Sequence, residues 1–163
     1  EILVKGENVM LGYWNNEEET NKVLKDGWLY TGDIGIFENG YLKITDRKKD
    51  ILITPGGDNI SPVKIENELS NSKFIDQSIV YGDNKPYLVA LLVLSEEYLN
   101  INDEQIEKEI YKINQNLAKI EQIKKFFTIN EKFSIENGML TPTLKLKRYK
   151  IVTKYKNQFE KLY

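Results

Sequence analysis

Asp33 has the residue type and setting that ribose recognition needs. It follows Thr31-Gly32, and a glycine at that place allows a tight turn and close approach of the backbone to a ligand. A carboxylate there can accept hydrogen bonds from vicinal hydroxyls, as acidic residues do with ribose. The alternative is that Asp33 only stabilises its own turn through the backbone, and the motif taken alone favours this alternative.

A second charged motif, Asp46-Arg-Lys-Lys-Asp50, begins 13 positions after Asp33. Arg47 carries a planar guanidinium that can bind phosphate or ribose oxygens with two parallel hydrogen bonds. A run of charges between two apolar segments is also typical of a solvated linker. By itself the motif favours the linker.

Lys145 lies in the segment Leu140-Thr-Pro-Thr-Leu-Lys-Leu-Lys-Arg148, two residues after the turn formers Thr141-Pro142-Thr143. A loop lysine of this kind can enter a cleft as a point charge. There it can stabilise negative charge that develops on a phosphate or carboxylate oxygen during group transfer. Most exposed lysines have no catalytic role, so Lys145 needs support from the other motifs.

Gly56 and Gly57 begin a flexible segment that runs into Ser61-Pro62, a pair typical of a helix start. Such a loop can lie against an extended ligand such as pantetheine, or bind an anion at the helix N-terminus. It lacks the Gly-Lys-Ser/Thr ending of a nucleotide phosphate loop. Taken alone, the segment is typical of a turn.

Composition narrows the chemistry further. The chain has 163 residues, 40% of them hydrophobic, which is enough for one packed domain or a domain with an appendage. The absence of Cys and His excludes Cys–His and Ser–His–Asp catalysis and the usual zinc sites, and it fits a reducing, cytoplasmic compartment. No apolar run is long enough for a transmembrane helix. The chain opens at Glu1 within an apolar run, so we expect a piece of a longer protein.

Charge is distributed unevenly along the chain. The net charge is −2, but residues 145–163 carry seven basic side chains and one acidic side chain, or +6, which leaves −8 for the rest. A basic terminal helix suggests contact with phosphates or with an anionic membrane surface. The alternative is an ordinary solvated helix face.

Apolar periodicity and turn signals predict the elements that must position these residues. Residues 1–46 read as β-rich, with a strand at 2–5, a short helix capped by Asn15-Asn16, and a hairpin turning at Asn39-Gly40. Residues 46–50 are the expected linker. Residues 51–163 predict a small α+β domain with a central sheet packed by helices.

Within that domain, a helix from Ser61 to about residue 71 is expected to bury Val63, Ile65 and Leu69. Strands are expected at 75–81, 87–94 and 126–133, and the second is apolar on both faces and therefore central. A helix from about residue 102 carries the stripe Ile106, Ile110, Ile113, Leu117 and Ile120. The final helix carries Ile151, Tyr155, Phe159 and Leu162 on one face.

Five motifs, in this order along the chain, resemble those of the adenylate-forming acyl-CoA synthetases. They are Gly6 to Trp14, Gly27-Trp-Leu-Tyr-Thr-Gly-Asp33, Asp46-Arg-Lys-Lys-Asp50, Gly56 to Glu66, and Thr141-Pro-Thr-Leu-Lys-Leu-Lys-Arg148. Asp46 to Asp50 and the Thr-Pro-Thr-Leu-Lys form most resemble the long-chain fatty acid–CoA ligases. The resemblance covers nearly the whole chain.

The resemblance implies a role for each candidate residue. Lys145 would be the adenylation lysine, and Asp33, Arg47 and Tyr30 would bind the ribose and phosphate of ATP or AMP. Asp46 and Lys49 would form the hinge of a mobile C-terminal domain. Gly56 and Gly57 would line the path of the CoA pantetheine. Leu144 departs from the pattern, because many relatives have glycine before the lysine, and this predicts a stiffer loop.

The same resemblance implies that the whole enzyme joins a fatty acid to CoA with ATP and Mg²⁺, through an acyl-adenylate. The phosphate loop, the acyl pocket, the adenine site and the magnesium-binding acid of the family's large N-terminal domain do not occur in these residues. We therefore expect the C-terminal segment of such a ligase, inactive alone, with no tightly bound cofactor, no metal site and no nucleic-acid partner. Its large N-terminal domain, fatty acid, CoA and a peripheral membrane contact through the basic helix are the expected partners.

Two other functions remain open from the sequence. One is an adenylating enzyme for another carboxylic acid, such as an aryl or amino acid. The acyl pocket would distinguish such an enzyme from a fatty acid–CoA ligase. The other is a non-catalytic module whose basic tail binds anionic lipid. Salt-dependent liposome binding that does not depend on Lys145 would favour the lipid-binding module.

Overall fold

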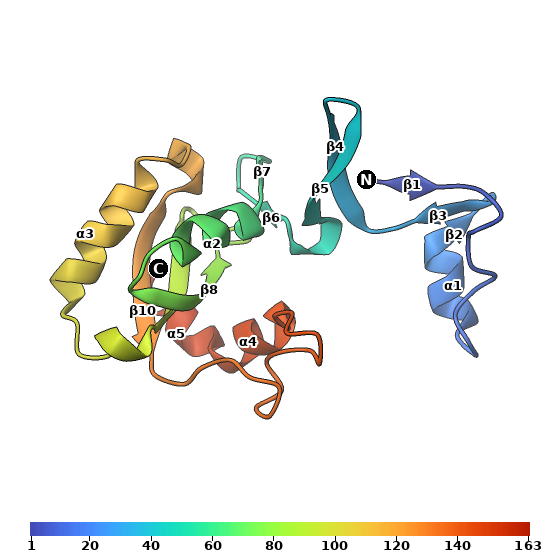
Figure 1. The fold of residues 1–163 in the computed structure, drawn as a ribbon. Helices are drawn as coiled ribbons and strands as arrows, with labels where there is room; N and C mark the ends of the chain where they lie inside the picture. The colour runs from blue at the N-terminus through green and yellow to red at the C-terminus, as the bar shows by residue number, and fades with distance from the viewer. The chain divides into compact units, whose positions relative to one another are not determined.

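The computed structural model describes residues 1–163, and its contacts divide the chain into two compact units, Glu1–Ile51 and Leu52–Tyr163 (Figure 1). The domain limits expected from the sequence stay a prediction.

The first unit is built mainly of short strands. Its elements are β1 (Leu3–Val4), α1 (Glu17–Val23), β2 (Leu24–Lys25), β3 (Trp28–Tyr30), β4 (Asp33–Glu38), β5 (Tyr41–Arg47) and the 3₁₀ turn η1 (Lys48–Asp50). Strands β1, β3 and β2 form one small sheet in that order, and β4 and β5 form a separate hairpin. The expected linker at 46–50 is thus partly regular, because Asp46 and Arg47 end β5.

Two local predictions for this unit are confirmed. The side chain of Asn16 caps α1 by accepting a hydrogen bond from the backbone N–H of Glu19. The β4–β5 hairpin turns at Asn39 and Gly40, which have φ angles of 52° and 82°. Positive φ at both central residues matches the right-handed twist of the strands, so the Asn-Gly pair fixes this turn.

The second unit alternates helices and strands. Its elements are β6 (Leu52–Ile53), β7 (Asn59–Ile60), α2 (Pro62–Ser70), β8 (Ile75–Tyr81), β9 (Leu88–Leu94), η2 (Glu96–Tyr98), α3 (Asp103–Asn114), η3 (Lys119–Glu121), β10 (Ile123–Ile129), α4 (Arg148–Lys154) and α5 (Lys156–Glu160). The main sheet has the order β10-β9-β8, with β9 parallel to β10 and antiparallel to β8. The predicted α+β class is confirmed.

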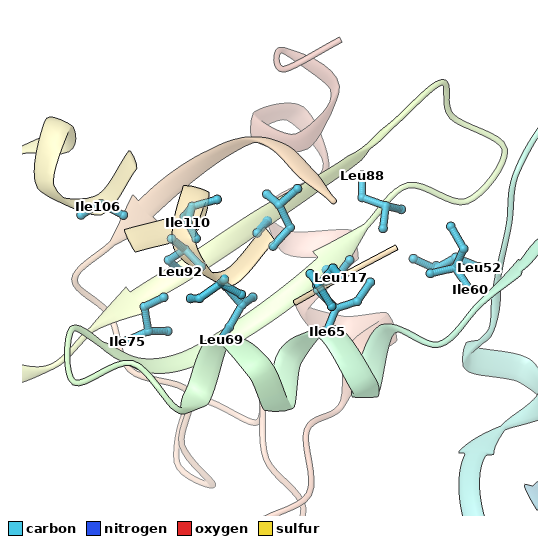
Figure 2. Close-up of a cluster of buried hydrophobic side chains, with 14 of the residues drawn as sticks. Leu52, Ile60, Ile65, Leu69, Ile75, Leu88, Leu92, Ile106, Ile110 and Leu117 are labelled. Atoms are coloured by element: carbon cyan, nitrogen blue, oxygen red, sulfur yellow. The ribbon is translucent and has the colours of Figure 1, made fainter. Parts of the chain in front are cut away.

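Strand β9 is central and buried on both faces, as its unbroken apolar sequence predicted. One face of the sheet packs Leu88 and Leu92 against α2 and α3, as the close-up in Figure 2 shows. The other face packs Val89, Leu91 and Val93 against the loop after β10 and against α4 and α5. Each face of the sheet therefore has its own hydrophobic core.

The expected buried face of α2 is partly wrong. Val63 is 37% exposed, whereas Ile65 and Leu69 are fully buried (Figure 2). Pro62 and Glu66 occupy the rest of the buried face. A polar residue at a buried helical position cannot be recognised from apolar spacing alone, and Glu66 has a specific partner described below.

The end of helix α3 and the start of strand β10 differ from the residues expected. Helix α3 ends at Asn114, so Ile120 lies outside it and is 50% exposed. The cause is a contact with the following strand: the Asn114 side-chain amide donates to the Ile123 carbonyl and accepts from the Ile123 N–H, each at 2.9 Å. Strand β10 therefore starts at residue 123 rather than 126.

The final helix is interrupted. Tyr155, with φ −102° and ψ 16°, separates α4 from α5. Ile151, Tyr155 and Phe159 are buried against the sheet, as their spacing predicted. None of the helices is long and apolar enough to cross a bilayer.

Candidate functional site

The structure joins two motifs that are separate in the sequence. Asp33 opens β4 and Arg47 ends β5, and the two are direct cross-strand partners. Their side chains form an ion pair, with 2.8 Å between Nε of Arg47 and Oδ1 of Asp33. The Asp33 side chain is 25% exposed and that of Arg47 is 53% exposed, so both reach solvent. The hairpin thus presents a carboxylate and a guanidinium side by side.

The turn before Asp33 is held by a neighbouring hydroxyl. Oγ1 of Thr31 accepts a hydrogen bond from the Asp33 N–H at 3.1 Å and donates to the Ile2 carbonyl at 2.8 Å. Gly32 has a φ of 72°, a value that favours glycine, and its carbonyl accepts from the Lys48 N–H. The Asp33 carboxylate is therefore left to Arg47 and to solvent. Its role in ribose binding stays a prediction.

Tyr30 lies at the end of β3, where it pairs with Leu3 of β1. The ammonium of Lys25 lies 5.3 Å from the centre of the Tyr30 ring. This is the distance of a cation–π contact, which orients the ring. The nucleotide contact of Tyr30 stays a prediction.

The predicted hinge contains an unusual carboxylate. Asp46 is only 6% exposed, and its Oδ1 accepts a hydrogen bond from the Arg47 N–H at 2.8 Å. Its other oxygen, Oδ2, is buried and has no hydrogen-bond partner. An unpaired buried carboxylate oxygen is costly. Lys49 is exposed within the 3₁₀ turn Lys48–Asp50, and its ammonium forms no ion pair.

The glycine loop is a hydrogen-bonded turn. Gly56 and Gly57 turn the chain between β6 and β7, a hairpin that was not predicted. Two backbone hydrogen bonds of 2.9 Å close the turn: the Thr54 N–H donates to the Asp58 carbonyl, and the Gly57 N–H donates to the Thr54 carbonyl. The Thr54 hydroxyl also donates to Oδ2 of Asp58 at 3.1 Å. The flexibility expected of this loop stays a prediction. The φ of 88° at Gly57 favours glycine through its backbone conformation. Space is not the reason, because an added Cβ would meet nothing within 4 Å.

Lys145 lies on a hydrogen-bonded turn. Its backbone N–H donates to Oγ1 of Thr141 at 3.0 Å, and its carbonyl accepts from the Thr141 N–H at 2.8 Å. Leu140 and Leu146 form an antiparallel bridge at the base of this turn. The Lys145 side chain is exposed, and its ammonium makes no hydrogen bond or ion pair. The turn therefore presents an unpaired cation on a constrained backbone.

Sequence reasoning missed a buried ion pair next to this turn. Arg148, the first residue of α4, lies 2.6 Å from Oε2 of Glu66 on α2. The two side chains are 16% and 10% exposed. The helical spacing of Glu66 from Pro62 and Leu69 puts it on the buried face of α2, but this spacing gave no sign of its partner.

The basic terminal segment is partly neutralised by ion pairs. Lys154 lies 2.5 Å from Oε2 of Glu131, and this hydrogen bond holds the pKa of the Glu131 carboxyl below its usual range. Arg148 is taken up by Glu66. The remaining lysines of the segment leave the predicted membrane contact open.

No group of three or more His, Cys, Asp or Glu side chains is placed to hold a metal ion, so Mg²⁺ rests on the resemblance alone.

Several known proteins are similar to this chain. The family model described as the AMP-binding enzyme C-terminal domain matches residues 49–163. The long-chain-fatty-acid–CoA ligase FadD15 of Mycobacterium tuberculosis is 34% identical over the whole chain, which spans 31% of that protein. Long-chain-fatty-acid–CoA ligase 5 of Rattus norvegicus is 40% identical over the whole chain, which spans 27% of it.

Solved structures agree with this match. The A domain of the carboxylic acid reductase from Segniliparus rugosus, in complex with AMP and a co-purified carboxylic acid, has a TM-score of 0.90 at 27% identity. The alignment covers 99% of this chain and 27% of that one. The O-succinylbenzoate coenzyme A synthetase of Bacillus subtilis, in complex with AMP, has a TM-score of 0.71 at 31% identity, covering 91% of this chain and 29% of that one. This chain spans about a third or less of each of these proteins.

Proposed function

Because this chain belongs to the AMP-binding enzyme C-terminal domain family of adenylate-forming enzymes, we propose that it is the C-terminal part of an ATP-dependent fatty acid–CoA ligase. In the first step, the carboxylate oxygen of the fatty acid attacks the α-phosphate of ATP, giving acyl-adenylate and pyrophosphate. In the second step, the CoA thiol attacks the acyl carbon and AMP leaves. The fatty acid, as opposed to another acid, is supported by the long-chain ligases among the relatives.

The observation that carries this proposal is the unpaired ammonium of Lys145 on a constrained turn. An exposed cation with no partner in its own domain is free to contact a ligand. Because two hydrogen bonds to Thr141 hold its backbone, only the side chain has to be ordered when the charge acts. We assign Lys145 to the adenylation step, where it stabilises negative charge that develops between the acyl carboxylate and the α-phosphate.

The other candidate residues fit the same reaction. Asp33 accepts hydrogen bonds from the ribose hydroxyls with its exposed oxygen, and Arg47 holds that carboxylate in place while its free N–H groups reach ribose or phosphate. The tight turn at Gly56 and Gly57 offers a surface without side chains, along which pantetheine passes in the second step. Lys49 and Asp46 serve as the hinge between the two steps.

The test of this proposal is a substitution at Lys145 in the ligase that joins this chain to a large adenylating domain. Lys145→Ala should slow acyl-adenylate formation by roughly a hundredfold to a thousandfold, or about 3–4 kcal/mol. Thioester formation from supplied acyl-adenylate should remain near the rate of the unsubstituted enzyme. Pyrophosphate release and CoA-thioester formation measure the two steps separately.

Lys147→Ala, two residues away on the same segment, is the matched control and should affect neither step. Equal losses in both steps for Lys145→Ala would make Lys145 merely structural. A selective loss for Lys147→Ala would move the assignment by two residues. The 163-residue chain alone should release no pyrophosphate from ATP and fatty acid, since we propose that the phosphate loop and the acyl pocket belong to the large domain.

A further inference from the structure

The buried ion pair between Glu66 and Arg148 connects three elements of the second unit. The Arg148 guanidinium donates to Oε2 of Glu66 at 2.6 Å and to the Val80 carbonyl at 3.2 Å. Oε1 of Glu66 accepts a hydrogen bond from the Val80 N–H at 2.7 Å. Side chains from α2 and α4 thus bind the N–H and the carbonyl of the same β8 residue, Val80.

This arrangement supplies what the start of α4 lacks. Lys147 at the N-cap makes no side-chain capping bond, and the first turn carries basic residues and no acidic ones. Positive charges at a helix N-terminus oppose the helix dipole. The Glu66 carboxylate places a negative charge beside Arg148 at this end. A fork of two hydrogen bonds also fixes orientation, which a single point charge does not.

The same helix start carries the Lys145 turn. Arg148 is the third residue after Lys145, and between them the Lys147 N–H donates to the Met139 carbonyl at 2.8 Å. The turn therefore has a short, hydrogen-bonded connection to Arg148, and Arg148 is fixed to the central sheet through Val80. A shift of Arg148 would move the turn relative to that sheet.

We propose that Arg148 and Glu66 are positioning residues that hold Lys145 in place for the adenylation step. The pair acts through the α4 start and the turn before it, without touching substrate. This inference rests on the proposed function of Lys145. A displacement of about 1 Å in such a group can cost on the order of a hundredfold in rate, even when the substitution lies away from the chemistry.

The first experiment measures both half-reactions of the ligase carrying Arg148→Lys, which keeps the charge and removes the fork. We expect acyl-adenylate formation to fall by on the order of tenfold to a hundredfold. The KM for ATP should change little, and thioester formation from supplied acyl-adenylate should stay within about twofold. Lys64→Gln is the matched control, since Lys64 lies on the same helix as Glu66, is 55% exposed and pairs with Glu121 at 2.7 Å. It should leave both steps unchanged.

The second experiment needs no catalysis. Amide hydrogen exchange in the 163-residue chain should accelerate at Thr141 and Lys145 in Arg148→Lys, and remain unchanged in Lys64→Gln. Glu66→Gln, which keeps a hydrogen-bond acceptor but removes the charge, should give an intermediate exchange rate. It also replaces Arg148→Lys in both experiments if that variant fails to fold.

The outcomes separate this inference from the proposed function. If Lys145→Ala is selective for adenylation but Arg148→Lys adenylates at the normal rate, the positioning role is wrong. Equal losses in both half-reactions with unchanged exchange at the turn would also overturn it. If Lys145→Ala itself shows no selective loss, the proposed function fails, while the exchange experiment still decides whether the pair holds the turn.

Discussion

At the scale of single residues, Leu144 is the clearest conformational exception near the proposed catalytic lysine. It has a φ of 60°, which places a side-chain-bearing residue in the left-handed region. That conformation costs a residue with a Cβ roughly 1–2 kcal/mol. The leucine side chain recovers little by packing, because it is 69% exposed. The turn that presents Lys145 is therefore formed against a local backbone preference.

Leu144→Gly should consequently stabilise the second unit. Relief of the left-handed strain, less the greater chain entropy of glycine in the unfolded state, leaves a gain of about 0.5–1 kcal/mol. Urea unfolding followed by circular dichroism measures the change in midpoint. Leu146→Gly is the control, because Leu146 has no positive φ and forms the bridge to Leu140, so it should destabilise the unit. A lower midpoint for Leu144→Gly would show that the leucine side chain contributes more than its exposure indicates.

At the scale of elements, the end of α5 is fixed to the sheet by a group of aromatic rings. The Tyr163 hydroxyl contacts the carbonyls of Tyr87 at 3.1 Å and Tyr81 at 3.4 Å. Burial, and then the neighbouring Tyr81 and Tyr87, raise the pKa of the Tyr163 phenol well above its usual range. The folded unit therefore strongly prefers the neutral phenol.

This shift makes the second unit sensitive to alkali. Above an unfolded pKa of about 10, the unfolded chain releases the Tyr163 proton while the folded chain keeps it, so stability falls as pH rises. Tyr163→Phe removes this group, and its stability should fall less steeply above pH 10. At neutral pH the variant should be less stable by about 1 kcal/mol, because it loses a buried hydrogen bond.

Urea unfolding of both proteins across the alkaline range measures the two slopes. Burial also raises the pKa values of Tyr81 and Tyr155, so part of the slope should remain in the variant. Identical slopes for the two proteins would mean that Tyr163 titrates alike in the folded and unfolded chains.

The sequence predicted the elements well where the signal was local. The cap at Asn16, the Asn39-Gly40 turn, the start of α2 at Ser61 and the buried strand β9 all depend on neighbouring residues, and the structure has each of them. The end of α3 was wrong because it depends on a bond from Asn114 to the next strand.

The candidate site follows the same division. Each motif residue was found because it stands in a short, ordered string. Glu66 and Arg148 are 82 positions apart, and each alone looks like an ordinary surface charge, so their pairing could not be predicted. The contact between Asp33 and Arg47 likewise required the register of the β4–β5 hairpin.

At the scale of the whole molecule, the proposed mechanism needs a change in backbone torsion between the two half-reactions. Lys49 is our candidate, since it is exposed in a single 3₁₀ turn and its side chain has no partner. Hinges are commonly a few residues at the end of an element that absorb such changes. The buried Oδ2 of Asp46, three residues before Lys49, has no hydrogen-bond partner in the chain.

Lys49→Pro should therefore separate the half-reactions in the whole ligase. Proline fixes φ near −65° and disfavours a helical backbone at the residue before it. We expect acyl-adenylate formation to be spared and thioester formation to be blocked. Both rates and the melting temperature are measured, with Lys49→Ala as the control that removes only the side chain. A normally folded Lys49→Pro enzyme with both rates unchanged would rule out rotation at this residue.

The division into two units also gives the chain a built-in optical label. Both of its tryptophans, Trp14 and Trp28, lie in the first unit, whereas the second unit contains tyrosine and phenylalanine only. Trp14 is 91% exposed and Trp28 is 41% exposed, beneath the ammonium of Lys5. Tryptophan emission therefore comes from residues 1–51 alone, whereas seven of the ten tyrosines lie in the second unit. Loss of the Lys5 contact at Trp28 gives the first unit an intrinsic fluorescence probe in an unlabelled sample.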